Sequence, residues 1–241
     1  MNIIKGKKSL QEALKSNHTQ IDRILVAYPQ KNKPEIISIL NQAKNKNIKI
    51  QFVSSEKIAE TTAETQNQGI VAYIQIAKTI DLQSILQNPQ KHPYILIADH
   101  LEDPYNFGAI IRTCEVLGFS AVIYPKDRNC QITPGVSKTS SGAIHHIEMV
   151  KVTNLASTLK KLKNAGYWLY GADSNQGQNL ADCRVNLPLA LIVGNEKKGI
   201  SPVIQKKLDC KIHIPQKGKV SSLNVSVATG IIIYHLTKTT C

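Results

Sequence analysis

Short apolar runs alternate with amphipathic stretches from Tyr94 onward, and this alternation constrains the fold more than any other feature of the chain. The runs of strand length are residues 94–98, 121–124, 167–172, 189–193 and 211–214. The stretches with helical spacing of apolar residues are 106–117, 154–166 and 223–236. Because strands that alternate with helices are typical of a mainly parallel sheet, we predict an α/β domain over residues 93–241.

The first 76 residues have the pattern of a second, smaller α/β unit. Its predicted strands are 24–28, 48–53 and 69–76, and its predicted helices begin near Ser9 and at Pro34. A polar, glutamine-rich stretch then separates the two patterned regions. We therefore expect two domains, 1–76 and 93–241, joined by a linker over residues 77–92.

The chain is strongly basic, with 30 lysines and arginines against 17 aspartates and glutamates, a formal net charge of +13 over 241 residues. Residues 1–76 carry 11 basic and 6 acidic side chains, and residues 77–241 carry 19 and 11, so the excess covers both regions. A general basic bias explains such a charge without any function, whereas a long polyanion would be bound through counterion release. Aromatic residues make up only 5% of the chain, which disfavours a binding surface built from stacked rings.

Membrane, secreted and zinc-binding proteins are disfavoured. No apolar run approaches the ~18 residues of a membrane span, and no apolar segment of a secretory signal follows the basic N-terminus. The cysteines are widely spaced without a C-x-x-C pair, which fits reduced thiols and disfavours disulfides and a zinc site. They are Cys114, Cys130, Cys183, Cys210 and Cys241. We expect a cytoplasmic, metal-free globular protein.

Three loops of the second region could carry chemistry, and the first is the strand-to-helix turn 99–112. Asn106 is a residue type that caps helices, so capping and a functional role both fit it. Arg112 falls opposite the apolar face of the predicted helix at about 100° per residue. It would either pair with Glu115 at i+3 or act on a ligand.

The second loop, 193–199, leaves an apolar strand through Gly194, which lets bare backbone approach a ligand, although a plain tight turn has the same pattern. It matches neither the dinucleotide fingerprint nor the phosphate-binding loop. The third loop, 214–226, leads into the last predicted helix, with Ser222 as a candidate cap. That helix is apolar on nearly every side, which predicts burial, and a subunit interface is one place for it.

These loops resemble the motifs of a known family. Residues 106–115 (NFGAIIRTCE), 194–199 (GNEKKG), and Ile214-Pro215 followed by 222–226 (SLNVS) are similar, in order, to the three motifs of the SpoU RNA 2′-O-ribose methyltransferases of the SPOUT superfamily. Residues 67–72 (NQGIVA) and the strand after them resemble the substrate-binding domain that precedes many of these enzymes. The resemblance implies a methyltransferase domain with a deep trefoil knot, a feature that pattern alone would not suggest.

The resemblance also implies a cofactor and a partner. In the family, S-adenosylmethionine lies folded in the knot against the backbone of the second and third motif loops. By position this nominates Gly194, Ile214 and Leu223 as cofactor contacts, and it implies no metal. The active site of the family forms at a dimer interface, so we expect a homodimer. Burial in that interface would explain why the last helix is apolar on nearly every side.

By position, the resemblance nominates five catalytic residues: Asn106, Arg112, Glu196, Ser222 and Asn224. A ribose 2′-hydroxyl must attack the methyl group in line and lose its proton, so positioning and electrostatics should supply most of the catalysis. A guanidinium stays protonated, and we therefore expect Arg112 to hold the target phosphate and stabilise the developing alkoxide. Glu196 and Asn224 would orient the nucleophile and the loops, and the proton acceptor is left open. Cys114 and Gln216 depart from the family's common Ala and Met without removing a catalytic candidate.

The family branch with the closest resemblance methylates a guanosine ribose in bacterial 23S ribosomal RNA, and we expect that activity. The alternatives are a tRNA methyltransferase of the same family and a non-catalytic module for RNA binding or ribosome assembly. The presence of all five polar residues argues against the module. The positive charge would then help to bind structured RNA, and we expect Lys5, Lys7 and Lys8 to contact it.

Overall fold

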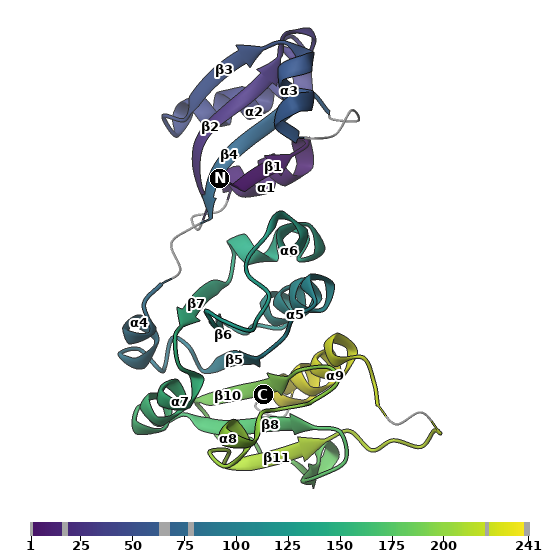
Figure 1. The fold of residues 1–241 in the computed structure, drawn as a ribbon. Helices are drawn as coiled ribbons and strands as arrows, with labels where there is room; N and C mark the ends of the chain where they lie inside the picture. Colours follow the sequence, from purple (N-terminus) through teal and green to yellow (C-terminus); the bar gives the residue numbers. More distant parts are fainter. Residues whose placement is uncertain (1, 16–18, 63–67, 77–79, 220–221, 239–241) are drawn as a thin grey trace. The chain divides into compact units, whose positions relative to one another are not determined.

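The computed structural model describes residues 2–15, 19–62, 68–76, 80–219 and 222–238, and the chain divides into two compact units, Met1–Lys78 and Thr79–Cys241 (Figure 1). The stretch expected to be a linker, 77–92, lies largely within the second unit. There α4 (Leu82–Leu86) buries Ile85 in the core, and the Asp81 side chain caps the helix by accepting from the amide of Gln83. One buried isoleucine in a polar stretch therefore makes this segment part of a domain.

The first unit is a four-stranded sheet with helices on both faces. Its strand order is β1-β4-β2-β3, and only the pair β2–β3 is parallel. The elements are β1 (Asn2–Lys5), α1 (Lys7–Lys15), β2 (Thr19–Ala27), the 3-10 turn η1 (Tyr28–Gln30), α2 (Pro34–Asn45), β3 (Lys49–Val53), α3 (Ser55–Thr62) and β4 (Ile70–Ile76). Helices α1 and α2 bury one face of the sheet, through Leu10 and Ile36 among others, and α3 covers part of the opposite face through Ile58.

Two elements of this unit are absent from the sequence-based prediction. Strand β1 has only 4 residues, and α3 buries only Ile58 and Thr62, so neither carries enough apolar residues for a clear period. Helix α1 also begins at Lys7, ahead of the expected start at Ser9. Gly6 lies immediately before it with a φ of +86°, which lets the chain turn out of β1 into the helix.

The second unit is built on a seven-stranded sheet in the order β7-β6-β5-β10-β8-β11-β9, with every neighbouring pair parallel. Its strands are β5 (Tyr94–Asp99), β6 (Ala121–Pro125), β7 (Glu148–Val152), β8 (Trp168–Asp173), β9 (Gln178–Asn179), β10 (Leu189–Gly194) and β11 (Cys210–His213). Its longer helices are α5 (Pro104–Val116), α6 (Pro134–Thr139), α7 (Leu155–Asn164) and α9 (Val225–Lys238), and α8 (Pro202–Gln205) is a single turn. The predicted α/β fold class is confirmed.

Alternate residues of β5 and β10, at the centre of this sheet, enter two separate cores. Leu96 of β5 and Leu191 of β10 face α5, α6 and α9, whereas Ile97 and Ile192 face α4, α7 and α8. Figure 1 shows α5 and α9 on one side of the sheet and α7 on the other. Burial on both faces explains why these strands read as continuous apolar runs.

Short elements again differ from the expectation. Strands β7 and β9 and helices α6 and α8 were not predicted, and each is no longer than 6 residues. The last helix begins at Val225 and is not buried on every side. Thr229, Ile232, Ile233 and Leu236 are buried, while Val227, Ile231 and Tyr234 stay exposed. Among the described residues, no helix is long and apolar enough to cross a membrane.

The N-terminus of α5 corrects one expectation directly. Asp103 is the N-cap, and its carboxylate accepts from the amides of Tyr105, at 3.0 Å, and Asn106, at 3.3 Å. Asn106 therefore lies inside the first turn and does not cap the helix. The cap three residues earlier leaves the Asn106 side chain available for other contacts.

The cap of α5 gives a stability prediction. Asp103→Ala should lower the free energy of unfolding of the second unit by about 1 kcal/mol, because two amides lose their acceptor. Asp103→Asn should stay close to the wild type, since an asparagine oxygen accepts the same bonds. Denaturant unfolding followed by fluorescence reports on this unit alone, because the single tryptophan is Trp168 of β8. Equal losses in both variants would contradict this account of the cap.

Candidate active site

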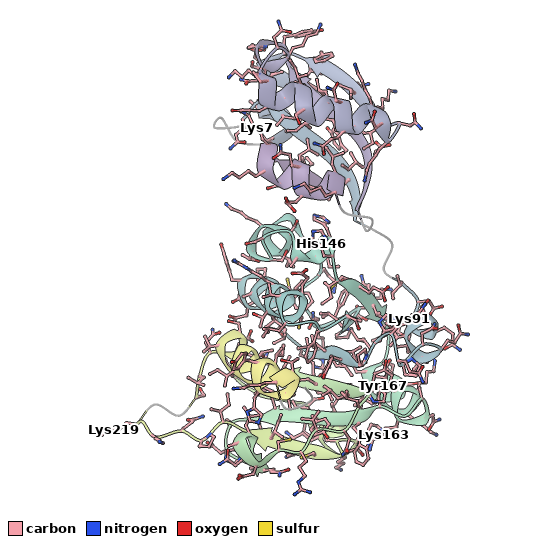
Figure 2. The ribbon with its side chains drawn as sticks, turned by 180° about the vertical axis from the view of Figure 1, so that it is seen from behind. Lys7, Lys91, His146, Lys163, Tyr167 and Lys219 are labelled. Carbon is pink, nitrogen blue, oxygen red and sulfur yellow. The ribbon has the colours of Figure 1, made fainter. Side chains whose placement is uncertain are left out.

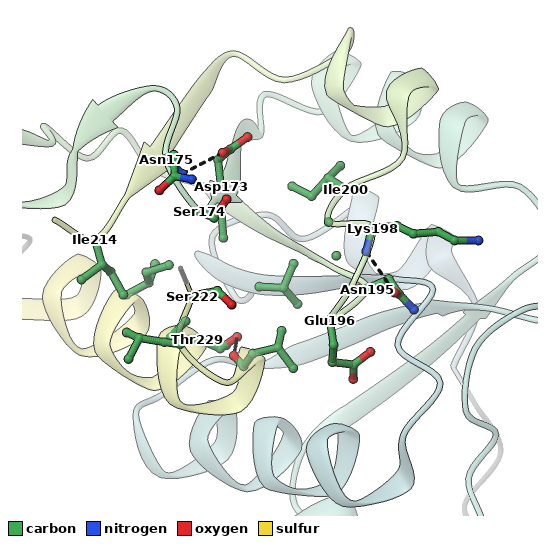
Figure 3. Close-up of a pocket in the computed structure, with 18 of the residues that line it drawn as sticks. Asp173, Ser174, Asn175, Asn195, Glu196, Lys198, Ile200, Ile214, Ser222 and Thr229 are labelled. Carbon is green, nitrogen blue, oxygen red and sulfur yellow. Dashed lines mark hydrogen bonds between the residues drawn. The ribbon is translucent and has the colours of Figure 1, made fainter. Parts of the chain in front are cut away.

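A pocket of about 460 Å³ lies at the carboxyl ends of β8, β10 and β11 (Figure 3). This edge is where parallel sheets bind ligands. Its lining includes Ala172–Asn175 at the end of β8, Val193–Ile200 at the end of β10, Ile214 and Gln216 after β11, Ser222 and Leu223 before α9, and Val225, Ala228, Thr229 and Ile232 of α9. Gln205 of α8 completes it. The lining is therefore made by loops that are far apart in the sequence.

The loop after β10 is a closed turn held by its own backbone. Asn195 and Gly199 exchange two hydrogen bonds, of 3.0 and 2.8 Å, and the Asn195 side chain accepts from the amides of Lys197 and Lys198. Gly199 has a φ of +66°. A Cβ on Gly194 would lie 2.2 Å from the carbonyl carbon of Gly199, so any side chain there would force the turn open. This loop is therefore a tight turn that also lines the pocket.

The end of β5 anchors the same loop at two points. Asp99 pairs in register with Gly194 and is fully buried, and its Oδ2 accepts from the amide of Ser201 at 2.7 Å. The Asn195 amide group donates to the carbonyl of His100 at 2.9 Å. These contacts tie both ends of the loop to the strand that leads into α5.

A chain of side-chain hydrogen bonds joins the three motif loops. Asn224 donates through Nδ2 to Oδ1 of Asn106 at 3.0 Å, and Asn106 donates through Nδ2 to Oε1 of Glu196 at 3.1 Å. The direction follows from the start of α9, where Asn224 Oδ1 already accepts from the amide and the hydroxyl of Ser226. With that oxygen engaged, Asn224 offers Asn106 its NH2 group, and Asn106 then turns its own NH2 group to the carboxylate.

The remaining candidates next to this chain line the pocket. Gly194, Ile214, Ser222 and Leu223 are all part of its lining, together with Glu196. Figure 3 shows Ile214 and Ser222 across the pocket from the loop that carries Asn195 and Glu196. Ser222 does not cap the last helix, because Asn224 occupies that role.

Arg112 lies apart from this group. It follows Asn106 by six residues in α5, which places it about 9 Å along the helix and roughly 240° around it. Its side chain is exposed, and Nη1 donates to Oγ of Ser141 at 3.2 Å, a bond that takes the place of the expected pairing with Glu115. Ser141 and Gly142 have φ angles of +51° and +90°, in the turn that follows α6. Within one chain, Arg112 and the pocket thus face different directions.

The α5–α6 contact sets the position of that turn. A Cβ on Gly108 would meet Oγ1 of Thr139 at 1.9 Å, so only glycine allows the two helices this approach. Thr139 also donates to the carbonyl of Pro104 at 3.2 Å. The α5–α6 contact therefore fixes the turn whose Ser141 supports Arg112.

Sequence reasoning missed the loop after β8. Asp173 accepts from the amides of Asn175 and Gln176 and lies 3.6 Å from Nζ of Lys211. Burial raises the pKa of Asp173, but the two amides and Lys211 lower it by more. The net pKa is therefore below its usual value, and the pocket holds a carboxylate at neutral pH. The sequence could have indicated Asp173 by its position directly after the predicted strand 167–172. The loops after β10 and β11 begin at the same edge of the sheet.

The three N-terminal lysines line a separate cavity of about 400 Å³ in the first unit. Lys5 donates to the carbonyl of Thr62 at 2.7 Å, and Lys7, labelled in Figure 2, forms an ion pair with Glu35. Lys8 is exposed. Two of the three ammonium groups thus already have contacts within the unit.

The described part of the chain contains no group of three or more His, Cys, Asp or Glu side chains that could hold a metal ion. Cys114, Cys130, Cys183 and Cys210 are free thiols, and Cys241 lies outside the described residues. Burial raises the pKa of the Cys183 thiol to about 11, with a smaller contribution from Cys210. This thiol is therefore protonated and unreactive at neutral pH.

Comparison with known proteins gives a consistent result over both units. The model of the SpoU rRNA Methylase family matches residues 93–234, and the model for RNA 2′-O ribose methyltransferase substrate binding matches residues 3–79. YacO of Bacillus subtilis, named for the TrmH family of tRNA/rRNA methyltransferases, is 36% identical over 234 residues, or 96% of this chain and 93% of its own.

Solved structures are similar as well. The AdoMet-bound rRNA methyltransferase from Sinorhizobium meliloti has a TM-score of 0.83 at 22% identity and covers 98% of this chain and 87% of its own. The TrmH/SpoU tRNA modifying enzyme of A. aeolicus has a TM-score of 0.56 at 32% identity and covers 66% and 83%. The motif resemblance is thereby confirmed, and the chain belongs to the SpoU methylase family, with a substrate-binding domain ahead of the methylase domain.

Proposed function

We propose that this protein transfers a methyl group from S-adenosylmethionine to the ribose 2′-hydroxyl of a guanosine in 23S ribosomal RNA. The observation that carries the proposal is the hydrogen-bond chain from Asn224 through Asn106 to Glu196, which joins three family motifs beside one pocket. A module that had lost catalysis would have no need to keep this polar chain. Family membership supports RNA methylation as the class of reaction.

The pocket suits S-adenosylmethionine in size and chemistry. Its volume of about 460 Å³ falls within the range of small-molecule sites. Ile214, Leu223 and Ile232 offer apolar contacts, and Asp173 and Glu196 offer carboxylates to a cationic ligand. Gly194 would bring its backbone close to the cofactor. When bound, the cofactor supplies an electrophilic methyl group on a sulfonium, and the S. meliloti neighbour is described as AdoMet-bound.

The side chains have separate tasks in this proposal. Asn106, Glu196 and Asn224 hold the three loops in register and orient the 2′-hydroxyl, with Ser222 beside them on the pocket wall. Arg112 carries a permanent charge, so it binds the phosphate of the target nucleotide and stabilises the alkoxide as its proton leaves. Preorganised donors of this kind act without reorganisation during the reaction.

We further propose that the protein acts as a homodimer. Because Arg112 and the pocket of one chain face different directions, a second copy is needed to bring Arg112 to the pocket. Val227, Ile231 and Tyr234 recur along α9 at helical spacing and are 51%, 42% and 58% exposed, and Leu223 is 43% exposed. An isologous contact through this stripe would bury it and pair each pocket with the other subunit's arginine.

The path of the chain in the C-terminal region fits the proposal. The chain passes from β11, beyond β8, back to α9, which packs against α5 and β10. We propose that this return is the threaded passage of the trefoil knot.

For the substrate, ribosomal RNA is favoured by the separate N-terminal unit, in which Lys5, Lys7 and Lys8 would contact RNA. Transfer RNA is the second candidate, because the A. aeolicus neighbour is named a tRNA modifying enzyme.

The substrate is tested by mapping 2′-O-methylated nucleotides in cells with and without the gene. We expect a guanosine of 23S ribosomal RNA to lose its methyl group, and purified protein with labelled cofactor to restore it on unmodified RNA. A lost methyl group in transfer RNA would replace the ribosomal assignment. Absence of label in every RNA would refute the enzyme assignment itself.

Arg112 is tested by substitution. Arg112→Ala should lower kcat about 100- to 1000-fold, the range for loss of one transition-state donor. Cofactor binding measured by calorimetry should be unchanged, because the proposal assigns Arg112 to the target phosphate and the developing alkoxide and not to the cofactor. Arg184→Ala removes an equally exposed arginine and should remain active. Wild-type activity in Arg112→Ala would remove it from the mechanism.

Sharing of the site between subunits is tested with mixed dimers. Arg112→Ala and Glu196→Gln should each be inactive alone, and co-expression should restore activity. Half of the dimers would be mixed, each with one intact site of two, so about a quarter of the wild-type activity is expected. Activity no higher than that of either parent would place Arg112 and Glu196 in the same chain's site.

A further inference from the structure

The loop after β2 presents an exposed aromatic ring on a fixed support. Tyr28 is 62% exposed, and its ring stacks on Phe52 of β3 with centroids 6.4 Å apart and an interplanar angle of 28°. Phe52 in turn packs against the core beneath α1 and α2. The domain thus backs one side of the Tyr28 ring and leaves much of the ring open.

Backbone contacts hold this loop in place. The amides of Lys31 and Lys33 donate to the carbonyls of Tyr28 and Gln30 at 3.2 and 3.1 Å. Gln30 lies against Gly69, where a Cβ would come within 2.5 Å of its Cγ. The ring is therefore positioned before any ligand arrives, which lowers the entropic cost of binding.

Two cations, Lys31 and Lys33, follow Tyr28 closely in the chain. Nζ of Lys31 lies 5.0 Å from the centroid of Phe52, in the range of a cation–π contact. Lys33 is exposed at the N-cap position of α2. Glu35, two residues further on, is ion-paired with Lys7. Tyr28, Phe52, Lys31 and Lys33 together form what we call the Tyr28 platform.

We propose that the Tyr28 platform binds an unpaired nucleotide of the substrate RNA, with the base stacked on Tyr28 and the flanking phosphates on Lys31 and Lys33. The choice of RNA as the ligand rests on the proposed function. An open ring on a rigid support beside cations is the combination by which proteins hold single-stranded nucleotides. A duplex keeps its base faces stacked inside and would gain nothing from the ring, and an acidic peptide would use only the lysines.

The ring is tested by fluorescence anisotropy with a labelled RNA hairpin that has an unpaired adenosine loop, and with a fully paired duplex of the same stem. Tyr28→Ala should raise the Kd for the hairpin about 5- to 100-fold and leave that for the duplex unchanged. Tyr28→Phe should bind as the wild type does, because the ring is retained. A wild-type Kd in Tyr28→Ala, or equal losses on hairpin and duplex, would overturn the proposal.

The cations are tested through salt dependence. Lys31→Gln with Lys33→Gln should reduce the slope of log Kd against log salt by about 1.4, the value for two phosphate contacts on a single strand. Lys44→Gln with Lys46→Gln makes the same charge change at the opposite end of α2 and is the matched control. Equal slopes in the two double variants would remove Lys31 and Lys33 from the footprint.

Turnover separates this proposal from the proposed function. Tyr28→Ala should raise the KM for RNA and leave kcat unchanged, because the platform lies outside the catalytic unit. If the wild type methylates RNA and Tyr28→Ala has the same KM, only the platform is refuted. If the wild type methylates no RNA, the proposed function fails, while the hairpin measurement still decides the platform.

Discussion

The hydrogen-bond chain from Asn224 through Asn106 to Glu196 is the interaction on which the site depends. It joins residues 118 and 90 positions apart in the sequence. Each amide has its direction set by its neighbour, beginning at the cap of α9, where Asn224 Oδ1 is engaged by Ser226. The same asparagine that caps a helix therefore determines how a carboxylate is held on another loop. One side chain thus serves both the helix cap and the hydrogen-bond chain.

The parallel sheet supplies the second constraint. Strand β10 lies between β5 and β8, so the loops after all three strands meet at one edge. Asp99, buried at the end of β5, holds the far end of the β10 loop, and Gly194 lets that loop close on itself. The arrangement leaves Arg112 on another side of α5. In the dimer proposed above, each chain would contribute two halves of a site, and the exposed apolar stripe of α9 would be buried between the chains.

The sequence predicted the elements with long apolar runs, because burial on both faces leaves a clear signal in β5, β8 and β10. It missed β1, β7 and α6, which are too short for their apolar residues to repeat with a recognisable strand or helix spacing. It also chose the wrong caps, Asn106 and Ser222, because Asp103 and Asn224 lie close by and suit the role equally well. The motif residues were recognised by resemblance. The direction in which Arg112 points was not predictable, since it depends on Ser141, 29 residues away across a helix contact.

The low aromatic content illustrates a limit of composition as an argument. A protein with 5% aromatic residues cannot cover a surface with rings, but one ring is enough when its support is rigid. Phe52 provides that support for Tyr28, because it is itself packed against the core. Charge spread over both units then adds affinity without selectivity, since phosphate contacts do not read sequence. A stacking ring also accepts any base, but it selects unpaired over paired nucleotides, and in the first unit the exposed, pre-positioned ring of Tyr28 can make that selection.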